Sequence, residues 1–332
     1  MRKYLLPENC NTYKANLHSH STWSDGCHSP EEMKKVYKEH GYSILSITDH
    51  NGLFSHYDLN EDDFLALTGY EVDFNRVHGN DYADFETAHF CAYPRERDNF
   101  TQPGLDMEYR SEKMRWTVNE ETRKLLRPDG KAFSKSYDPE NVNACLKILR
   151  DKNFIVTYNH PCWSVEDYSN YMSYDEIDCM EVYNHGCYVA GWDEYNGRMY
   201  DDILRSGKII KCVATDDNHG THDTCGGFTM FFAKKLCHED IINAFDNGDF
   251  YCSTGPEITA LYMEDGKLHI ETKEKYEEIR LVTGHRRASR VCGEDHACFA
   301  VHPSCKYVRL EVVHGSKRAY TNAYPVSVLL GE

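Results

Sequence analysis

The chain has 332 residues, enough to bury a large core and to form one large domain or two. Its net charge of −17 at pH 7 argues against a surface for nucleic-acid phosphates, which needs clustered Lys and Arg. The longest apolar runs fall short of the roughly 18 residues that a membrane span needs, and residues 1–7 are too short and polar for a secretory signal. We therefore expect a small-molecule partner, with neither a nucleic-acid polymer nor a membrane.

The 14 cysteines show no Cys-x-x-Cys spacing, and many sit inside apolar stretches. Disulfide frameworks are typical of short secreted chains, and this chain is long. We expect reduced, mostly buried thiols and therefore a cytoplasmic protein.

Strand and helix signals alternate along the first two thirds of the chain. Helices are predicted after the N-cap residues Ser29 and Asp138, the first ending at Gly41, and a third from about 192 to 206, ending at Gly207. Runs rich in Val, Ile, Tyr and Phe predict seven strands, at residues 13–17, 43–48, 64–70, 88–93, 154–159, 179–183 and 209–215. This alternation predicts an α/β fold, a distorted seven-stranded (β/α) barrel over residues 1–256.

Residues 94–137 interrupt the alternation. They are polar and charged, and they read as an insertion that is helical around 105–126. The insertion is either a lid or substrate-selecting wall, or a solvated loop. Residues 249–256 look like a crossover into a small antiparallel β-sandwich domain over 257–332, with strands at 258–263, 268–272, 279–283, 297–301 and 307–313.

Metal-binding side chains follow the predicted strands at or just beyond their ends, with a small offset at His89. Barrel enzymes carry their working residues at the carboxyl ends of strands. A His-x-His pair on a strand sends both imidazoles to one face, and nitrogen and carboxylate donors without thiolates suit zinc, manganese or iron. The candidate ligands are His18, His20, Asp25, His50, Glu71, His89, His160, Asp217 and His219.

These motifs resemble, in order, those of the polymerase and histidinol phosphatase (PHP) superfamily of metal-dependent phosphoesterases. The first is Asn16-Leu-His-Ser-His-Ser-Thr-Trp-Ser-Asp-Gly26 and the second is Ile47-Thr-Asp-His-Asn51. Shorter matches surround Glu71, His89 and His160, and Thr215-Asp-Asp-Asn-His219 resembles the last motif, which makes Asp217 rather than Asp216 the ligand. Asp25 stands where the family often has His. The C-terminal segment is similar to the end of two-domain members.

The resemblance implies two or three divalent ions. His18, His20, Glu71 and Asp217 are expected around a first ion, Glu71, His89 and His160 around a second, and Asp25, His50 and His219 around a third. It implies hydrolysis of a small phosphoester by a metal-bound hydroxide, without a Ser or Cys nucleophile. Neither the metal nor the oligomeric state follows from the sequence.

Other residues have supporting roles in this interpretation. Asp49 and Asp216 neighbour ligands and are expected to orient imidazoles as hydrogen-bond acceptors. His185 is either a proton donor or a residue hydrogen-bonded within its own loop. Candidate substrate contacts are Arg76, Trp163, Tyr183, Asn184 and Arg198.

Two other functions remain open. The same ions could hydrolyse a carboxylic ester, amide or carbamate, which few positive side chains near the motifs would favour. A metal-stabilised barrel could instead present its β domain to a carbohydrate or protein, although a structural metal site is normally closed by four ligands.

Overall fold

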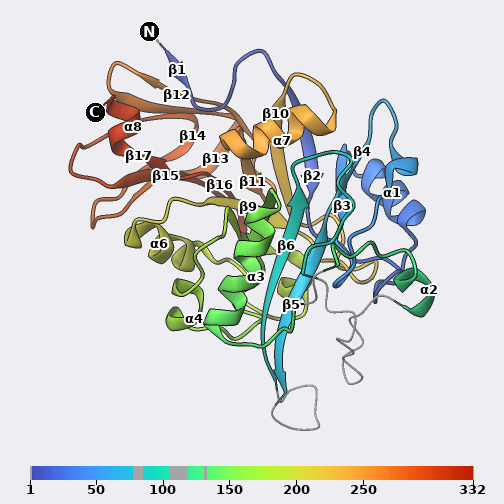
Figure 1. Ribbon diagram of the computed structural model, residues 1–332. Helices are drawn as coiled ribbons and strands as arrows, with labels where there is room; N and C mark the ends of the chain where they lie inside the picture. The colour runs from blue at the N-terminus through green and yellow to red at the C-terminus, as the bar shows by residue number, and fades with distance from the viewer. Residues whose placement is uncertain (1, 78–84, 105–118, 131–132, 332) are drawn as a thin grey trace.

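The computed structural model describes residues 2–77, 85–104, 119–130 and 133–331 of a mixed α/β protein (Figure 1). Its strands form two hydrogen-bonded sheets, of 12 and five strands in the described ranges. The larger sheet comprises β1 (Lys3–Tyr4), β2 (Asn11–Asn16), β3 (Ile44–Ile47), β4 (Leu65–Thr68), β10 (Phe228–Ala233), β11 (Phe250–Ser253), β12 (Ile258–Glu264), β13 (Lys267–Thr283), β14 (Ser289–Ala300), β15 (Tyr307–His314), β16 (Lys317–Thr321) and β17 (Tyr324–Pro325). The smaller sheet comprises β5 (Tyr70–Val77), β6 (Phe85–Pro94), β7 (Phe154–Tyr158), β8 (Cys179–Asn184) and β9 (Lys211–Thr215).

The described residues also form helices. They are α1 (Pro30–Glu39), α2 (Glu120–Arg123), α3 (Pro139–Asp151), α4 (Tyr168–Met172), α5 (His185–Val189), α6 (Gly197–Ser206), α7 (His238–Asn247) and α8 (Val326–Leu330), with a 3₁₀ turn η1 (Tyr57–Leu59). The predicted caps are present: Ser29 caps α1 in a capping box with Glu32, and Asp138 caps α3. Helix α6 ends at Gly207 as predicted, but it begins later than predicted because Asn196 donates its backbone N–H to Val182 on β8.

The two sheets enclose a common interior. Strands β2, β3 and β4 run parallel in one sheet, and β7, β8 and β9 run parallel in the other. One core cluster contains side chains from both sheets, among them Leu17, Leu67, Cys91, Ile155 and Val213. Closure into a single seven-stranded barrel is not confirmed, since β5–β6 and β6–β7 pair antiparallel and the strands divide between two sheets.

The chain changes sheets at Gly69, where the sequence predicted one continuous strand. Strand β4 ends just before it, and β5 begins just after it in the other sheet. A Cβ at Gly69 would lie 2.7 Å from Ser46 Oγ and 2.7 Å from the Tyr93 ring. Only glycine fits this close approach, and the switch brings Glu71 to the edge facing His50.

The C-terminal strands continue the larger sheet. Strand β16 pairs with β11, so the predicted crossover at 249–256 is wrong in part: it contains β11, which pairs on both sides. The predicted runs 268–272 and 279–283 form one long strand, β13. A separate sandwich is not confirmed, and the boundary at 256/257 stays a prediction.

The predicted helix at 105–126 lies largely outside the described residues, which contain α2 in that range. All 14 cysteines are free, as predicted, and seven of them are buried, so the prediction of mostly buried thiols holds for half of them. Within the described ranges, no helix has the length and apolar character that crossing a bilayer requires.

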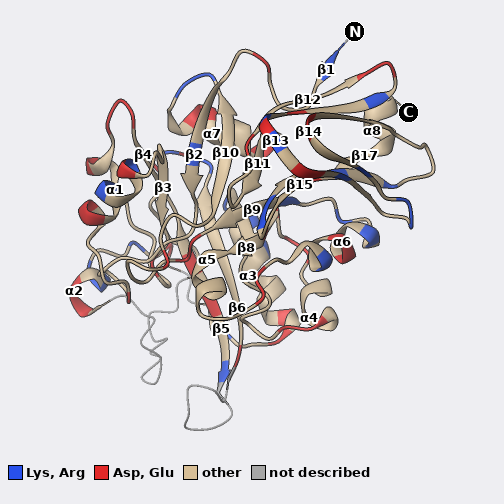
Figure 2. Cartoon of the chain, turned by 180° about the vertical axis from the view of Figure 1, so that it is seen from behind, with Lys and Arg blue, Asp and Glu red and all other residues tan. Residues whose placement is uncertain are grey.

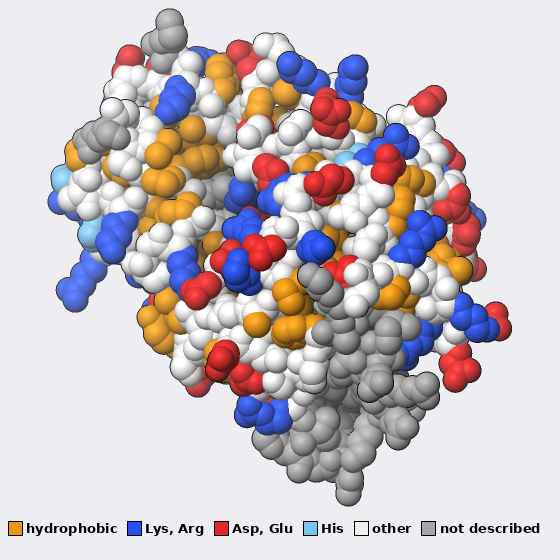
Figure 3. Space-filling model, in the orientation of Figure 1, with side chains coloured by type: hydrophobic (Ala, Val, Ile, Leu, Met, Phe, Trp, Pro, Cys, Tyr) orange, Lys and Arg blue, Asp and Glu red, His pale blue; other side chains and the backbone are white. Residues whose placement is uncertain are grey.

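Charged side chains are spread over many elements. Figure 2 shows Lys and Arg on separate helices and strands, and Figure 3 shows them interspersed with Asp and Glu on the face drawn. The expectation that the protein binds no nucleic-acid polymer remains a prediction.

Candidate metal centre

The strand ends carry the candidate ligands to one place. His18 and His20 follow β2, and His50 follows β3. Single backbone bridges join Ser19 to Asn218 and His50 to Glu71, so the segment after β9 lies beside the segment after β2. Four overlapping groups of donor atoms, each within 4.8 Å of one another, contain all nine candidate ligands: His18, His20, Asp25, His50, Glu71, His89, His160, Asp217 and His219.

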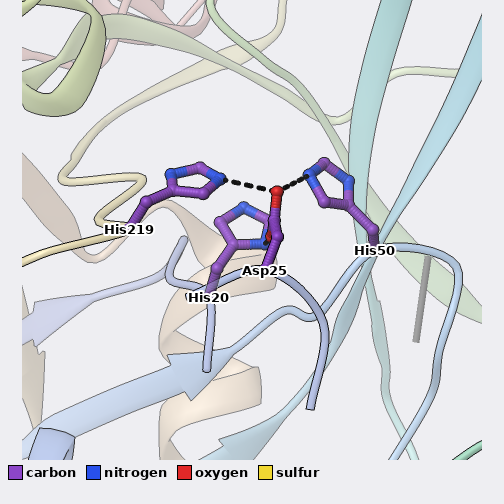
Figure 4. A group of neighbouring side chains, drawn as sticks. All are labelled: His20, Asp25, His50 and His219. Atoms are coloured by element: carbon purple, nitrogen blue, oxygen red, sulfur yellow. Dashed lines mark ion pairs between the residues drawn. The ribbon is translucent and has the colours of Figure 1, made fainter. Parts of the chain in front are cut away.

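The groups divide these donors somewhat differently from the expected pockets. His20 belongs both to a group with Asp25, His50 and His219 and to a group with His18 and Asp217. Figure 4 shows the first of these groups, with the imidazoles of His50 and His219 turned toward the Asp25 carboxylate. Glu71 joins His18 and His160 in one group and His50 and His89 in another, as a bridging carboxylate would.

The distances between the candidate donor atoms fit ligands that bind the same metal ion. His18 Nε2 lies 3.2 Å from Glu71 Oε1 and 3.2 Å from Asp217 Oδ1. His160 Nε2 lies 3.2 Å from Glu71 Oε1, and His219 Nε2 lies 3.4 Å from Asp25 Oδ2. Two ligands held tetrahedrally at about 2.0–2.1 Å from one ion lie about 3.3 Å apart. These spacings are therefore those of ligands around a common cation.

One buried atom supports the same conclusion. Among the described residues, His20 Nδ1 has no hydrogen-bond partner although its side chain is fully buried. Buried polar atoms are normally satisfied. Glu71 Oε2 lies 3.0 Å from His50 Nδ1 and 3.5 Å from His20 Nε2, so this buried carboxylate oxygen faces two imidazoles of the donor set. The donor set thus fits divalent cations.

The electrostatics keep the carboxylates ionised. Burial alone would raise the pKa of Asp217 and Glu71, but His18 and the other imidazoles hold both well below their usual range. Burial, together with the neighbouring His50 and His219, lowers the pKa of His20 to about 4. Ionised carboxylates and neutral imidazoles are the forms that bind metals. Although burial opposes it, Glu71 raises the pKa of His160 to about 9 and Asp25 raises that of His219 to about 10, so these imidazoles share protons with the carboxylates.

Two candidate ligands have strained backbones. His160 has φ 22° and Asp217 has φ 51°, in the left-handed region that side-chain-bearing residues avoid. Backbone hydrogen bonds hold them there: His160 N donates to Glu181 Oε2 at 2.8 Å, and Asp217 N donates to His18 O at 2.9 Å. Such strain is characteristic of functional sites.

Glu181, on β8, is a functional residue that the sequence analysis missed. Its Oε1 accepts from His18 Nδ1 at 2.7 Å and from Thr215 Oγ1 at 2.6 Å, while Oε2 also accepts from Asn184 Nδ2 at 2.9 Å. It fixes the tautomer of His18, so that Nε2 faces the other donors. The signal available in the sequence was a carboxylate inside the apolar run at 179–183.

The two aspartates expected to orient imidazoles contact other groups. Asp49 accepts from the backbone and hydroxyl of Ser21 and from the Ser24 hydroxyl, which fixes the loop leading to Asp25. Asp216 accepts from Tyr37 and from three backbone N–H groups at 225–227. Both therefore shape loops that carry ligands, and Glu181 is the carboxylate that orients an imidazole.

A cavity of about 330 Å³ opens over the donors. Its walls beyond the ligands come from residues after β7, β8 and β9: Trp163, Gly186, Cys187, Ala190, His222 and Asp223. Of the residues expected to contact substrate, Trp163 lines this cavity, its ring centre 4.9 Å from that of His160. Asn184 instead supports the centre, donating to Asp217 Oδ2 at 3.2 Å.

The remaining expected contacts lie elsewhere. Arg198 is exposed and pairs with Asp202, and Arg76 pairs with Glu86 and with the Tyr137 carbonyl. Tyr183 Oη lies 2.8 Å from His185 Nδ1, a contact within the same segment. In the described part of the chain, none of these three residues lines the cavity, and neither does Asn184, so their sequence-based roles are not supported by position.

No protein-family model matches the chain. A segment of 38 residues is 50% identical to DNA polymerase/3'-5' exonuclease PolX of Bacillus subtilis, and it covers 11% of this chain but only 7% of that protein.

Solved structures are similar over more of the chain. One is a two-domain protein from Bacteroides vulgatus containing a predicted PHP-like metal-dependent phosphoesterase, at 14% identity, 97% coverage of both chains and a TM-score of 0.47. Another is an amidohydrolase from Chromobacterium violaceum, at 14% identity, 64% coverage of this chain, 90% of the other, and a TM-score of 0.42. The candidate donor groups by themselves fit divalent metal ions.

Proposed function

We propose that this protein is a phosphoesterase that hydrolyses a small phosphorylated molecule at a centre of two or three divalent ions, such as zinc, manganese or iron. The observation that carries the proposal is the convergence of nine nitrogen and carboxylate donors on one buried centre at the base of a cavity. When bound, such ions activate a water molecule at neutral pH and neutralise charge on the phosphoryl oxygens.

Residues of the chain hold the candidate ligands in place and shape the cavity. Glu181 and Asn184 hold His18 and Asp217 in place, and Trp163 covers the ring of His160 at the cavity wall. The cavity volume of about 330 Å³ suits a small substrate rather than a folded polymer.

Hydrolysis of a carboxylic ester, amide or carbamate is the second candidate. The described cavity lining contains no Lys or Arg, whereas a phosphate dianion is usually bound by such side chains in addition to metals. A neutral carbonyl substrate needs no such partner.

One experiment separates these candidates. The protein is stripped with EDTA, reloaded with Mn²⁺, Zn²⁺ or Fe²⁺, and assayed on p-nitrophenyl phosphate, bis(p-nitrophenyl) phosphate and p-nitrophenyl acetate. We expect chelator-sensitive cleavage of a phosphate ester. Cleavage of the acetate alone would support the carbonyl candidate, and bound metal without any hydrolysis would favour a binding protein.

The matched variants are Asp217→Asn, which removes a candidate ligand, and Asp151→Asn, an exposed aspartate on α3. Asp217→Asn should lower turnover by more than about 100-fold while circular dichroism stays native. Asp151→Asn should match the wild type.

We also propose a reducing, cytoplasmic location. The 14 free cysteines support it, because such thiols persist in reducing compartments.

A further inference from the structure

The insertion at 94–137 contacts the ligand-bearing loops directly. Its described parts are joined to each other at Gln102 and Pro128, where Gln102 N donates to Arg127 O at 2.8 Å and Asp129 N donates to Gln102 O at 3.1 Å. Gln102 is 2% exposed. These parts are therefore a folded unit with a buried polar side chain, and that side chain must have partners inside the protein.

Gln102 fastens the loop that follows His50. Its Nε2 donates to Asn51 O at 3.0 Å, and its Oε1 accepts from Leu53 N at 3.0 Å. One side-chain amide thus satisfies two backbone groups of this loop. Asn51 has φ 54°, so this loop is strained and needs such support.

Lys135 joins the same loop to the strand of Glu71. Its Nζ donates to Asp73 O at 2.8 Å and to Asp73 Oδ1 at 3.0 Å, and it also contacts Asn51 Oδ1. The Asn51 amide in turn donates to Asp73. The Lys135 side chain is 6% exposed, so water weakens these charge-assisted hydrogen bonds little.

A third contact reaches the loop between His20 and Asp25. Asn119 N donates to Trp23 O at 3.1 Å, and its side-chain amide donates to Thr22 O at 3.2 Å. The insertion therefore touches the three segments that carry Asp25, His50 and Glu71, far apart in sequence from 102, 119 and 135.

We propose that the described parts of the insertion, residues 94–104, 119–130 and 133–137, are a brace that sets the positions of these candidate ligands, with Gln102 and Lys135 as positioning residues. The group of His20, Asp25, His50 and His219 depends on it most, because two of the braced loops supply that group. This inference rests on the proposed function only in requiring that the centre binds metal. Outer contacts of this kind typically change metal affinity by about 10–100-fold.

The test is calorimetric titration of metal-free protein with Zn²⁺, together with bound metal measured by mass spectrometry after dialysis. Gln102→Leu and Lys135→Met should each weaken at least one Zn²⁺ site by about 10–100-fold. Lys135→Arg, which keeps the charge, should recover most of the affinity. The controls within the insertion are the exposed Thr101→Ala and Lys124→Met, which should bind Zn²⁺ like the wild type.

A role limited to stability gives a different result. It would lower the melting temperature of the metal-free variants and leave the Zn²⁺ affinity of the folded protein unchanged, which would overturn the brace. If Gln102→Leu does not fold, Gln102→Asn, which shortens the amide's reach by one carbon, takes its place. Wild-type protein that binds neither Zn²⁺ nor Mn²⁺ would contradict the proposed function itself, whereas normal wild-type binding with unchanged variants would contradict the brace alone.

Discussion

At the scale of single residues, the candidate centre depends on carboxylates that are not themselves candidate ligands. Glu181 is the clearest case, because it contacts His18, Thr215 and the backbone of His160 at once. A histidine that binds a metal through one nitrogen usually donates its other N–H to such an acceptor. Replacing this carboxylate therefore tests the orientation of the imidazole rather than the ligand itself.

We predict that Glu181→Gln weakens Zn²⁺ binding by about 10–100-fold, since a neutral amide is a poorer acceptor for the His18 N–H. Titration calorimetry of the metal-free protein measures this loss. Glu176→Gln is the control, because Glu176 lies on the surface with its partner Arg150. Equal affinities for Glu181→Gln and wild type would show that His18 needs no such partner.

Glu166 gives a prediction about pH. Burial raises its pKa to about 7, although Tyr137 donates to it at 2.9 Å and Tyr158 and Tyr174 donate as well. The ordinary value is about 4.3, so the folded protein binds an extra proton between the two values. The raised pKa of Glu166 contributes about 3 kcal/mol to the free energy of unfolding below about pH 4. This contribution is lost as the pH rises to about 7.

Glu166→Gln removes this titration. Relative to wild type, the variant should gain about 3 kcal/mol of unfolding free energy between pH 5 and pH 8. Urea denaturation of the metal-free proteins at several pH values measures the gain. Other buried carboxylates, such as Glu194, are present in both proteins and cancel in the difference. Parallel pH profiles would contradict the raised pKa.

The sequence predicted the candidate donors better than the residues that hold those donors in place. His18, His50 and Asp217 stand in short motifs at strand ends, where residues close together in the sequence form the pattern. Glu181 and Gln102 stand in no motif, and their partners come from segments more than 20 residues away in most cases, so only the folded chain brings them together. The carboxylate inside the apolar run at 179–183 was a local signal for Glu181, but it could not show which imidazole Glu181 would contact.

At the scale of elements, helix caps were predictable because Ser29 and Asp138 act within one turn. The sheet switch at Gly69 was not, because its cause is the approach of Ser46 and Tyr93 from other strands. The apolar run at 64–70 looks the same in the sequence whether it forms one continuous strand or the end of one strand followed by the start of another.

Gly69→Ala tests this switch. The added Cβ would crowd Ser46 Oγ and the Tyr93 ring, which should cost about 1–3 kcal/mol of unfolding free energy. Urea denaturation measures it. The double variant Gly69→Ala/Ser46→Ala removes one of the two crowding atoms and should recover part of the loss. A double variant as unstable as the single one would place the whole effect on Tyr93 or on the backbone.

At the scale of the whole molecule, the C-terminal strands are joined to the rest of the chain in two ways. Strand β16 extends the larger sheet through β11. Arg309 on β15 is buried and donates to Asp201 of α6 at 2.8 Å from both Nε and Nη2, with Glu311 also within 2.6 Å. The region after 257 is therefore held to the α/β part by a sheet and by a buried ion pair.

This arrangement predicts that Asp201→Ala destabilises the protein by about 3–5 kcal/mol, because the variant leaves Arg309 buried with only Glu311 as a carboxylate partner. Asp151→Ala, which removes the exposed partner of Lys147 on α3, should cost less than about 1 kcal/mol. Urea unfolding followed by tryptophan fluorescence and circular dichroism measures both. Coincident transitions would show that the C-terminal strands unfold together with the rest, as a shared sheet requires. An early transition in Asp201→Ala alone would instead show that the ion pair, more than the β11–β16 pairing, holds the two parts together.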